Sequence, residues 1–329
     1  MIKEYNEAFS EQWDEFVFEK SVNGNFLQSR QFLSYHPDDR FLDASLMYFD
    51  AKGNLRAVIP AAKIIEGSGM MEFVSHPGST YGGPVIDKKT CGIKRAQELL
   101  DELIEYLKNE GYSKAEFKLP PNFLWNYESA SLFEYLFSYK KFKEEIELTT
   151  YIDFSFYKEK TVSNFSQGKR TNINNGIKQG LKSEVLSSKE QAQEFYVLLC
   201  ETLKKHDAKP VHTFEELWNL YSEKLVGKTE LLGVYNGEEL VAAGWLFLFD
   251  SQKAVHTQYL AANPDYGKLS PMTFLYYSAI EYCRERDIRY LSWGISTEER
   301  GKVLNLGLTE SKESFGSLFD VHRRYSINF

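Results

Sequence analysis

The stretch LLGVYNGEELVAAGW, residues 231–245, predicts a β-hairpin, because a polar Asn-Gly turn separates two largely apolar runs. An earlier stretch, LMYFDAKGNLRAVIP, residues 46–60, has the same form. The alignment that places Leu55 on Leu240 also places Tyr81 on Tyr266, and a glycine follows each tyrosine. One shift along the chain therefore superposes two separate features, which favours an internal duplication over chance similarity.

Each Tyr-Gly pair leads into a pattern that predicts a helix followed by a strand. In the first half, apolar residues recur at helical spacing over residues 96–107, and a strand is expected over 115–119. The second half repeats this plan, with a helix over 274–283 and a strand over 290–294. Each half therefore reads as hairpin, strand, glycine-bearing turn, helix and strand.

Further helices are expected ahead of each of these units. A capping box that begins at Ser10 predicts a helix to about residue 19, and Ser187-Ser188 opens another. A third is expected over residues 213–225. Together the elements predict an α/β fold (α+β layered) with two tandem domains, each a mostly antiparallel sheet flanked by helices. The expected boundaries are residues 1–150 and 151–329.

Composition narrows the class of protein. The formal net charge of −8 argues against nucleic acid as the main partner, because phosphate contacts need many lysines and arginines. No apolar run approaches the ~20 residues of a membrane span. The N-terminus lacks the apolar core of a secretory signal, so we expect a cytoplasmic protein. The sequence leaves the oligomeric state open.

Metal and thiol chemistry have little support in the sequence. The three cysteines, Cys91, Cys200 and Cys283, lie far apart, and none is in a Cys-x-x-Cys pair. No two histidines lie four residues apart with an acid between them, so no metal site is expected.

The order strand, glycine-bearing turn, helix, strand resembles the acyl-CoA-binding core of the GNAT acyltransferases, and the tandem arrangement resembles their Fem-like branch. Three strings carry the resemblance: FLQSRQFL (residues 26–33), KRTNINNGIKQGL (169–181) and ESKESFGS (310–317). A fourth, HPGSTYGG (76–83), is similar to the N-acyltransferases that act on nucleotide-linked amino sugars. Two features depart from the family: the second half lacks a long helical arm, and its phosphate-loop counterpart, 263–271, has one glycine.

The resemblance implies transfer of an acyl group from acyl-CoA, a co-substrate, to the amine of a small acceptor. The acceptor that the resemblance suggests is an amino sugar, nucleotide-linked as in that branch, for cell-surface polysaccharide synthesis. The substrates would lie between the two halves. Two alternatives stay open. One is an aminoacyl-tRNA-dependent peptidyltransferase of peptidoglycan precursors, which would bring in tRNA as a partner. The other is a GNAT scaffold that binds a ligand without catalysis.

Candidate site residues follow from the loops and from the resemblance. The donor would bind where a helix begins at Pro271, because a helix N-terminus favours phosphate. The donor set is Tyr266, Gly267, Lys268 and Ser270. The acceptor set combines Ser79, Thr80 and Tyr81 of the glycine-rich loop with Arg170, which the resemblance favours, and with Trp293 and Lys312 near the expected cleft. An ordinary turn at either loop is the competing structural interpretation.

Histidine is the candidate general base, because its unperturbed pKa lies near working pH. His76 and His36 are the candidate catalytic residues, with His256 as a weaker one. A purely structural role for each is the alternative. The other three, His206, His212 and His322, are interpreted as surface or helix-end residues.

Overall fold

The computed structural model describes residues 1–35, 40–67, 69–125, 130–205 and 207–329. Two compact units make up the chain. Unit 1 consists of Met1–Glu147, Glu299–Lys302 and Val321–Phe329, and unit 2 consists of Leu148–Glu298 and Val303–Asp320. The last nine residues thus belong to the unit that begins the chain. His36, one of the two candidate bases, lies outside the described residues.

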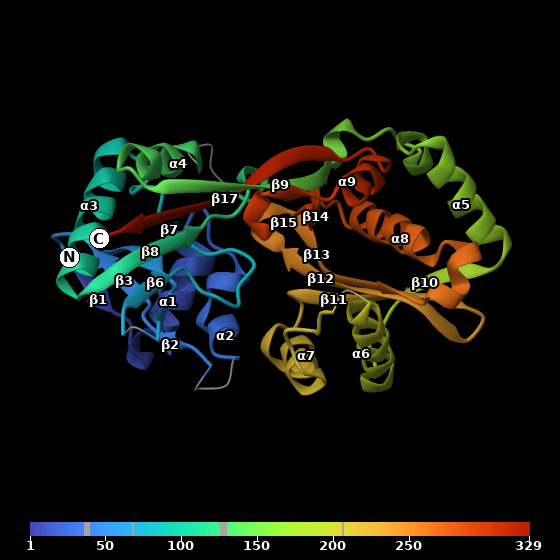
Figure 1. The fold of residues 1–329 in the computed structure, drawn as a ribbon, viewed down its shortest axis with the longest axis horizontal. Coiled ribbons are helices and arrows are strands. Elements are labelled where there is room, and N and C mark those ends of the chain that lie inside the picture. The colour runs from blue at the N-terminus through green and yellow to red at the C-terminus, as the bar shows by residue number, and fades with distance from the viewer. Residues whose placement is uncertain (36–39, 68, 126–129, 206) are drawn as a thin grey trace. The chain divides into compact units, whose positions relative to one another are not determined.

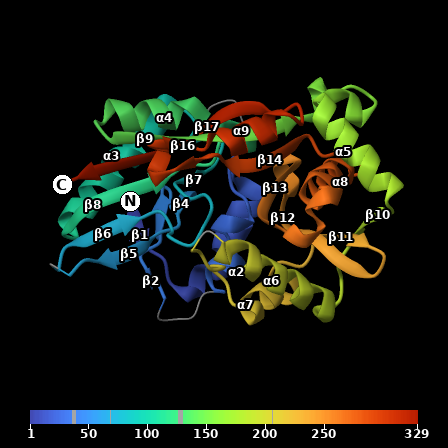
Figure 2. The same ribbon diagram turned by 45° about the vertical axis from the view of Figure 1, so that its right-hand side comes forward.

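Unit 1 holds two groups of strands and two longer helices (Figures 1 and 2). One sheet has the order β1-β3-β4-β7, and the other strands follow the order β17-β8-β6-β5-β2. Helices α3 and α4 pack on each other, and α3 also packs on β8. The elements are β1 (Ile2–Glu4), α1 (Ser10–Glu15), α2 (Arg30–Leu33), β2 (Leu42–Asp43), β3 (Leu46–Phe49), β4 (Leu55–Ile59), β5 (Ala62–Ile65), β6 (Met71–Val74), β7 (Val85–Ile86), α3 (Ile93–Asn109), β8 (Tyr112–Lys118), α4 (Ala130–Tyr139), the first part of β9 (Lys143–Asp153) and most of β17 (Leu318–Asn328).

Unit 2 places its strands in the order β10-β11-β12-β13-β14-β9. Figure 1 shows α6 and α7 on one side of these strands and α8 on the other. The elements are α5 (Gln167–Lys178), β10 (Leu181–Val185), α6 (Lys189–Lys204), α7 (Phe214–Asn219), β11 (Thr229–Asn236), β12 (Glu239–Phe249), β13 (Ala254–Ala262), α8 (Pro271–Glu285), β14 (Tyr290–Ile295), β15 (Thr297–Glu298), β16 (Val303–Leu304) and α9 (Leu306–Glu313).

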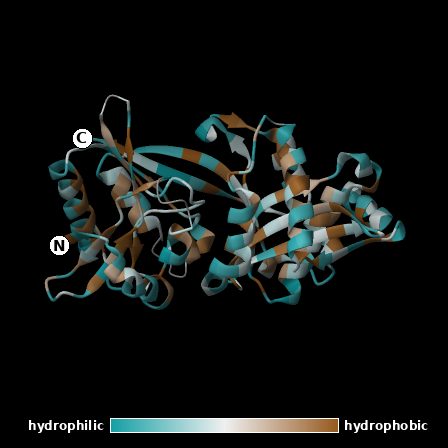
Figure 3. Ribbon diagram, turned by 90° about the horizontal axis from the view of Figure 1, so that it is seen from below, coloured by the Kyte–Doolittle hydropathy of each residue, from teal (hydrophilic) through white to brown (hydrophobic). Residues whose placement is uncertain are grey.

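The two predicted hairpins form as expected. β3 pairs with β4, and β11 pairs with β12, both antiparallel. The predicted helices become α3 and α8, and α3 buries Ala96, Leu99, Leu100, Leu103 and Leu107 against unit 1. Figure 3 shows much of the hydrophobic colour on the strands, with hydrophilic residues frequent at the turns. The apolar runs and the apolar helix faces that the sequence indicated therefore contribute to both cores.

Helix starts agree with the sequence in two cases and differ in one. Ser188 and Thr213 each form a capping box, with Gln191 and Glu216. The capping box expected at Ser10 is wrong, because Phe9 is the N-cap residue of α1 and makes no side-chain cap. The chain already turns in a 3-10 helix, Glu7–Phe9, that Asn6 caps, so Ser10 enters α1 as a helical residue.

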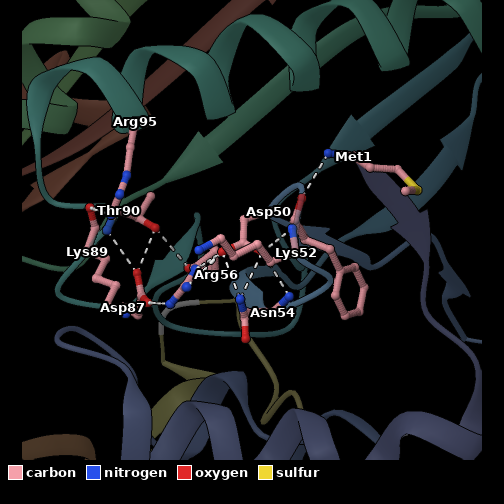
Figure 4. A network of polar contacts seen from close by, with 10 residues as sticks. Met1, Asp50, Lys52, Asn54, Arg56, Asp87, Lys89, Thr90 and Arg95 are labelled. Carbon is pink, nitrogen blue, oxygen red and sulfur yellow. Dashed lines mark hydrogen bonds and ion pairs between the residues drawn. The ribbon is translucent and has the colours of Figure 1, made fainter.

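A polar network in unit 1 joins the hairpin turn to the segment that leads into α3 (Figure 4). The Arg56 guanidinium donates from Nε to Asp50 at 2.8 Å and from Nη1 to Asp87 at 2.8 Å. Asp87 also accepts hydrogen bonds from the backbone and side chain of Thr90. Arg56 and Asp87 are largely shielded, with side-chain exposures of 16% and 11%. The network therefore stabilises the local fold of unit 1.

Candidate acyl-transfer site

Strands β13 and β14 of unit 2 are parallel but separate part-way along their length. Their pairing covers Ala254 to His256 on β13 and Tyr290 to Ser292 on β14. In the registers of the described residues, β13 continues to Ala262 without pairing to β14. Beyond His256, the backbone N–H and C=O groups on this edge of β13 therefore have no ladder partner on β14.

A β-bulge lies on the opposite edge of β13 at the same level. The β12–β13 register runs from Trp245↔Tyr259 to Leu246↔Thr257, which leaves Gln258 as an extra residue. A bulge turns the local backbone and interrupts the regular ladder. Strand separation on one edge and a bulge on the other make residues 257–259 a place where a backbone N–H can donate to the carbonyl oxygen of an acyl donor.

His256 is the last residue of β13 that pairs with β14. Its side chain is 5% exposed, and its Nδ1 atom lies 3.0 Å from Ser292 Oγ. Ser292 Oγ also accepts a hydrogen bond from Gly294 N at 3.3 Å. The histidine that sequence reasoning ranked lowest among its candidates therefore lies directly at the strand separation.

Trp293 lies on β14, and the Lys312 amine binds the C-terminal end of the same strand. The Lys312 amine donates to Gly294 O at 3.1 Å, Ile295 O at 2.8 Å and Ser296 Oγ at 2.9 Å. Burial lowers the pKa of Lys312 to about 7. A pKa near 7 suits proton transfer at neutral pH. The three hydrogen bonds of the Lys312 amine, however, are all made to residues 294–296.

Trp293, the other acceptor candidate on this strand, faces the core. Its Nε1 donates to Ser317 Oγ at 2.9 Å, and its ring lies 4.6 Å from that of Tyr276. With a side chain 4% exposed, Trp293 supports β14 and offers little surface to a ligand. Its role as an acceptor residue stays a prediction.

The candidate donor loop, residues 263–270, is filled by its own 3-10 helix, Pro264–Leu269. Asp265 N donates to Asn263 Oδ1, and Ser270 N donates to Gly267 O. Tyr266 donates its hydroxyl hydrogen to the Glu239 carboxylate. Several amides that a phosphate could use are therefore engaged, and two acids, Glu239 and Asp265, lie at the loop.

The start of α8 agrees with the sequence in one respect and differs in another. Pro271 is the first helical residue, as expected. Ser270 is the N-cap residue but makes no side-chain cap, because its backbone is left-handed (φ 52) whereas capping side chains normally extend from β-region backbone. Gly267 and Lys268 are exposed, so both are accessible to a ligand.

Arg170 lies on α5, a helix that carries three cations, Lys169, Arg170 and Lys178, and no acid. Its guanidinium donates to Gln167 Oε1 at 2.7 Å. The neighbouring Lys169 donates to Ser311 Oγ at 3.1 Å, lies over the Phe315 ring, and has a pKa lowered by burial. Arg170 is therefore the better placed of these two cations for a phosphate.

The glycine-rich loop of unit 1, residues 76–83, is packed tightly against β8. Gly82 N donates to Lys118 O at 2.7 Å, and a Cβ at Gly82 would lie 2.7 Å from Ser75 O. Gly83 has φ +82, and its Cβ would lie 2.5 Å from Leu119 Cδ2. Close packing and backbone conformation thus account for two of the three glycines.

The polar residues of this loop differ in accessibility. Ser79 Oγ donates to Tyr81 O at 2.7 Å, and Thr80 is half-buried. Tyr81 is 2% exposed and contacts the His322 ring edge-on at 5.2 Å. His76 is also buried, and burial lowers its pKa to about 4, which makes its imidazole a weak base at neutral pH.

Sequence reasoning missed Lys118 and misplaced His322, both of which lie near this loop. Desolvation, together with Arg324, lowers the pKa of Lys118 to about 8. His322 is 3% exposed within β17, so its interpretation as a surface or helix-end residue is wrong. His212 directly precedes the helix cap Thr213, as a helix-end residue should, and His206 lies outside the described residues. β17 brings His322 back to unit 1, which no local pattern could indicate.

The described residues contain no group of three or more His, Cys, Asp or Glu side chains that could hold a metal ion. Within the same residues, no helix is both long and apolar enough to cross a membrane.

Residues 167–300 match the family described as acetyltransferase (GNAT) domain. Three solved structures share the fold. FemX has a TM-score of 0.71 at 13% identity, over 100% of this chain and 97% of that one. This fold is that of the tandem GNAT and Fem-like acyltransferase superfamily.

L-PGS from Bacillus licheniformis has a TM-score of 0.63 at 15% identity, over 98% of this chain and 92% of that one. A tandem GNAT protein from the clavulanic acid biosynthesis pathway has a TM-score of 0.58 at 7% identity, over 100% and 98%. The comparison with curated proteins gave no significant sequence match. The GNAT match covers the separated strands β13 and β14, their bulge and the start of α8.

Proposed function

We propose that this protein transfers an acyl group to an amine at the separation of β13 and β14 in unit 2. The observation that carries the proposal is the open edge of β13 beyond His256, opposite the bulge at Gln258. An edge of this kind can bind an extended acyl donor through backbone hydrogen bonds and leave one N–H for the developing oxyanion. The GNAT match over residues 167–300 supports the same assignment.

The reaction requires the neutral amine to attack the acyl carbon. A carbon–nitrogen bond forms, the bond to the carrier breaks, and the amine proton leaves while the carrier sulfur or oxygen takes one up. In the proposed site, residues 257–259 orient the carbonyl group of the acyl donor. His256 directly precedes them on β13, and its imidazole can relay a proton. Lys312 maintains the backbone of residues 294–296 through its three hydrogen bonds.

Acyl-CoA is the first candidate donor. Its phosphates would lie at the N-terminus of α8, where Gly267 and Lys268 are exposed. Arg170 on α5 is a second accessible cation in the same unit. The candidate acceptor is a nucleotide-linked amino sugar, the acceptor class that the resemblance of residues 76–83 suggests.

An aminoacyl ester of tRNA is the second candidate donor, and one specific observation favours it. The loop 263–270 uses its amides internally and lies beside Glu239 and Asp265, an environment that disfavours a diphosphate. A further solved structure of the same fold is the C-terminal domain of a protein described as a putative lysylphosphatidylglycerol synthetase from Agrobacterium fabrum.

One experiment separates the two donors. The protein is incubated with acetyl-CoA or with aminoacyl-tRNA and a panel of amines that includes nucleotide-linked amino sugars, and the acylated product is measured by mass spectrometry. Lys268→Ala should raise the KM for acyl-CoA ~10-fold with kcat unchanged, since one charge-assisted phosphate contact is worth ~1.5 kcal/mol. The matched control Lys253→Ala removes an exposed lysine at the opposite end of β13. Absence of product with every donor and amine would overturn the proposed transfer.

A further inference from the structure

A pocket of about 570 Å³ opens in unit 2 between the end of α6 and residues 207–213. Its wall includes Tyr196, Cys200, Ala208, Pro210 and Val211. This volume lies within the range of small-molecule sites, roughly 300–1,000 Å³. The acyl-transfer proposal makes no use of this pocket.

The chain forms this pocket by reversing direction after α6. Ala208 N donates to Leu203 O at 3.1 Å, and Asp207 adopts a left-handed backbone (φ 51). Such a turn ends a helix and satisfies its last carbonyl groups. The segment that follows runs back along α6 to Thr213, which caps α7. The pocket is the space enclosed by this reversal.

Hydrogen bonds fix the inner wall. Tyr196 donates its hydroxyl hydrogen to His212 O at 3.1 Å. Tyr259 of β13 accepts a hydrogen bond from Val211 N at 3.4 Å, and its hydroxyl lies 3.3 Å from His212 Nδ1. The wall is therefore attached to both α6 and the sheet, so the pocket is largely preformed.

The chemistry of the pocket differs between wall and mouth. The wall is mainly apolar and aromatic, and Val211 leaves 63% of its side chain exposed at the opening. Lys204 and Lys209 are exposed lining residues, and Asp207 is the single acid of the lining. The pocket thus combines apolar surface with two exposed positive charges.

We propose that this pocket binds an aliphatic carboxylate, with its chain against Tyr196, Pro210 and Val211 and its head group at Lys204 and Lys209. Burial of the aliphatic chain against apolar side chains supplies the affinity. The lysines select an anionic head group over a cationic one. This inference is independent of the proposed acyl transfer.

Cys200 lines the pocket and provides a reporter. The other cysteines, Cys91 and Cys283, are 9% and 0% exposed. The rate of Cys200 alkylation by iodoacetamide is measured by peptide mass spectrometry with decanoate, decylammonium or acetate, each below any micelle concentration. Decanoate at ten times its Kd should slow alkylation about tenfold by occupying the pocket. Acetate should have no effect because it has no chain.

Charge-reversal variants test the head group. Lys204→Glu combined with Lys209→Glu should abolish protection by decanoate, whereas Lys205→Glu, a neighbouring exposed lysine outside the wall, should retain it. Circular dichroism establishes that each variant is folded. Equal protection by decanoate and decylammonium would overturn the anionic specificity. Failure of decanoate to protect the unsubstituted protein would overturn the site itself, whatever the outcome of the transfer assay.

Discussion

His256 on β13 lies against Gly294 on β14, so closely that a Cβ atom at Gly294 would come 3.2 Å from His256 Cε1. Gly294 also has φ +73, a left-handed conformation that side chains with a Cβ adopt at a cost. A glycine at this position therefore lets the backbone approach the histidine at the point where the two strands separate.

We expect Gly294→Ala to destabilise unit 2 by about 1–2 kcal/mol, the combined cost of the left-handed backbone and the tight contact. Urea unfolding followed by circular dichroism measures the change. Gly168→Ala is the matched control, because Gly168 lies in α5 with no atom within 4 Å of its Cβ position. The control should be neutral or slightly stabilising, and an equal loss in both variants would contradict the steric explanation.

Lys312→Met should destabilise the protein at pH 6 by roughly 2–4 kcal/mol, because the Gly294 and Ile295 carbonyls lose their buried donor. The urea midpoint and slope give this free energy. Ser314→Ala on the same helix end removes only a local hydrogen bond to Ser311 O and should cost less than 1 kcal/mol.

Comparing the stability of the wild type and of Lys312→Met at several pH values tests the lowered pKa of Lys312. The folded-state pKa is about 7, below the ordinary 10.5, so between these values the unfolded chain binds more protons. The stability contributed by this group is therefore lowest below pH 7 and increases as the pH rises. The free-energy difference between the wild type and Lys312→Met should widen from pH 7 to pH 9, and a constant difference would show that the pKa is not lowered.

His76→Asn should change stability most between pH 4 and pH 6.5. Burial lowers the folded-state pKa of His76 to about 4 from the ordinary 6.5, so the unfolded chain takes up the proton first as the pH falls. The stability that neutral His76 contributes is present above pH 6.5 and is lost as the pH drops toward 4. Unfolding at pH 5 and pH 7 should show a smaller pH effect in the variant. Asparagine is suitable because it tolerates the positive φ of this position.

Arg56→Met should cost unit 1 about 1–3 kcal/mol, because Asp50 and Asp87 would lose a shared, partly shielded partner. Arg95→Met provides the control, since Arg95 is exposed and makes one long hydrogen bond, to Lys89 O at 3.4 Å. Thermal unfolding compares the two. A loss at Arg95 as large as that at Arg56 would indicate a general effect of removing surface charge.

Sequence patterns predicted the local elements of this fold well. Hairpins, amphipathic helices and most caps depend on residues close together in the chain, so the spacing of apolar residues and the turn at Asn236-Gly237 were sufficient. Candidate site residues were predicted less completely. His322 becomes buried and Lys118 becomes partly desolvated because distant strands pair. The 3-10 helix over residues 264–269 satisfies amides that the sequence left open for phosphate.

The sequence by itself predicted the tandem plan and the GNAT-type fold, because both are expressed in repeated local patterns that include the hairpin of residues 231–245. Only the tertiary structure decided that Val321–Phe329 joins unit 1, that β13 and β14 separate after His256, and that residues 207–213 enclose a pocket. These features arise from pairing and packing between segments far apart in the chain, and their free energies depend on contacts that no single stretch of sequence contains.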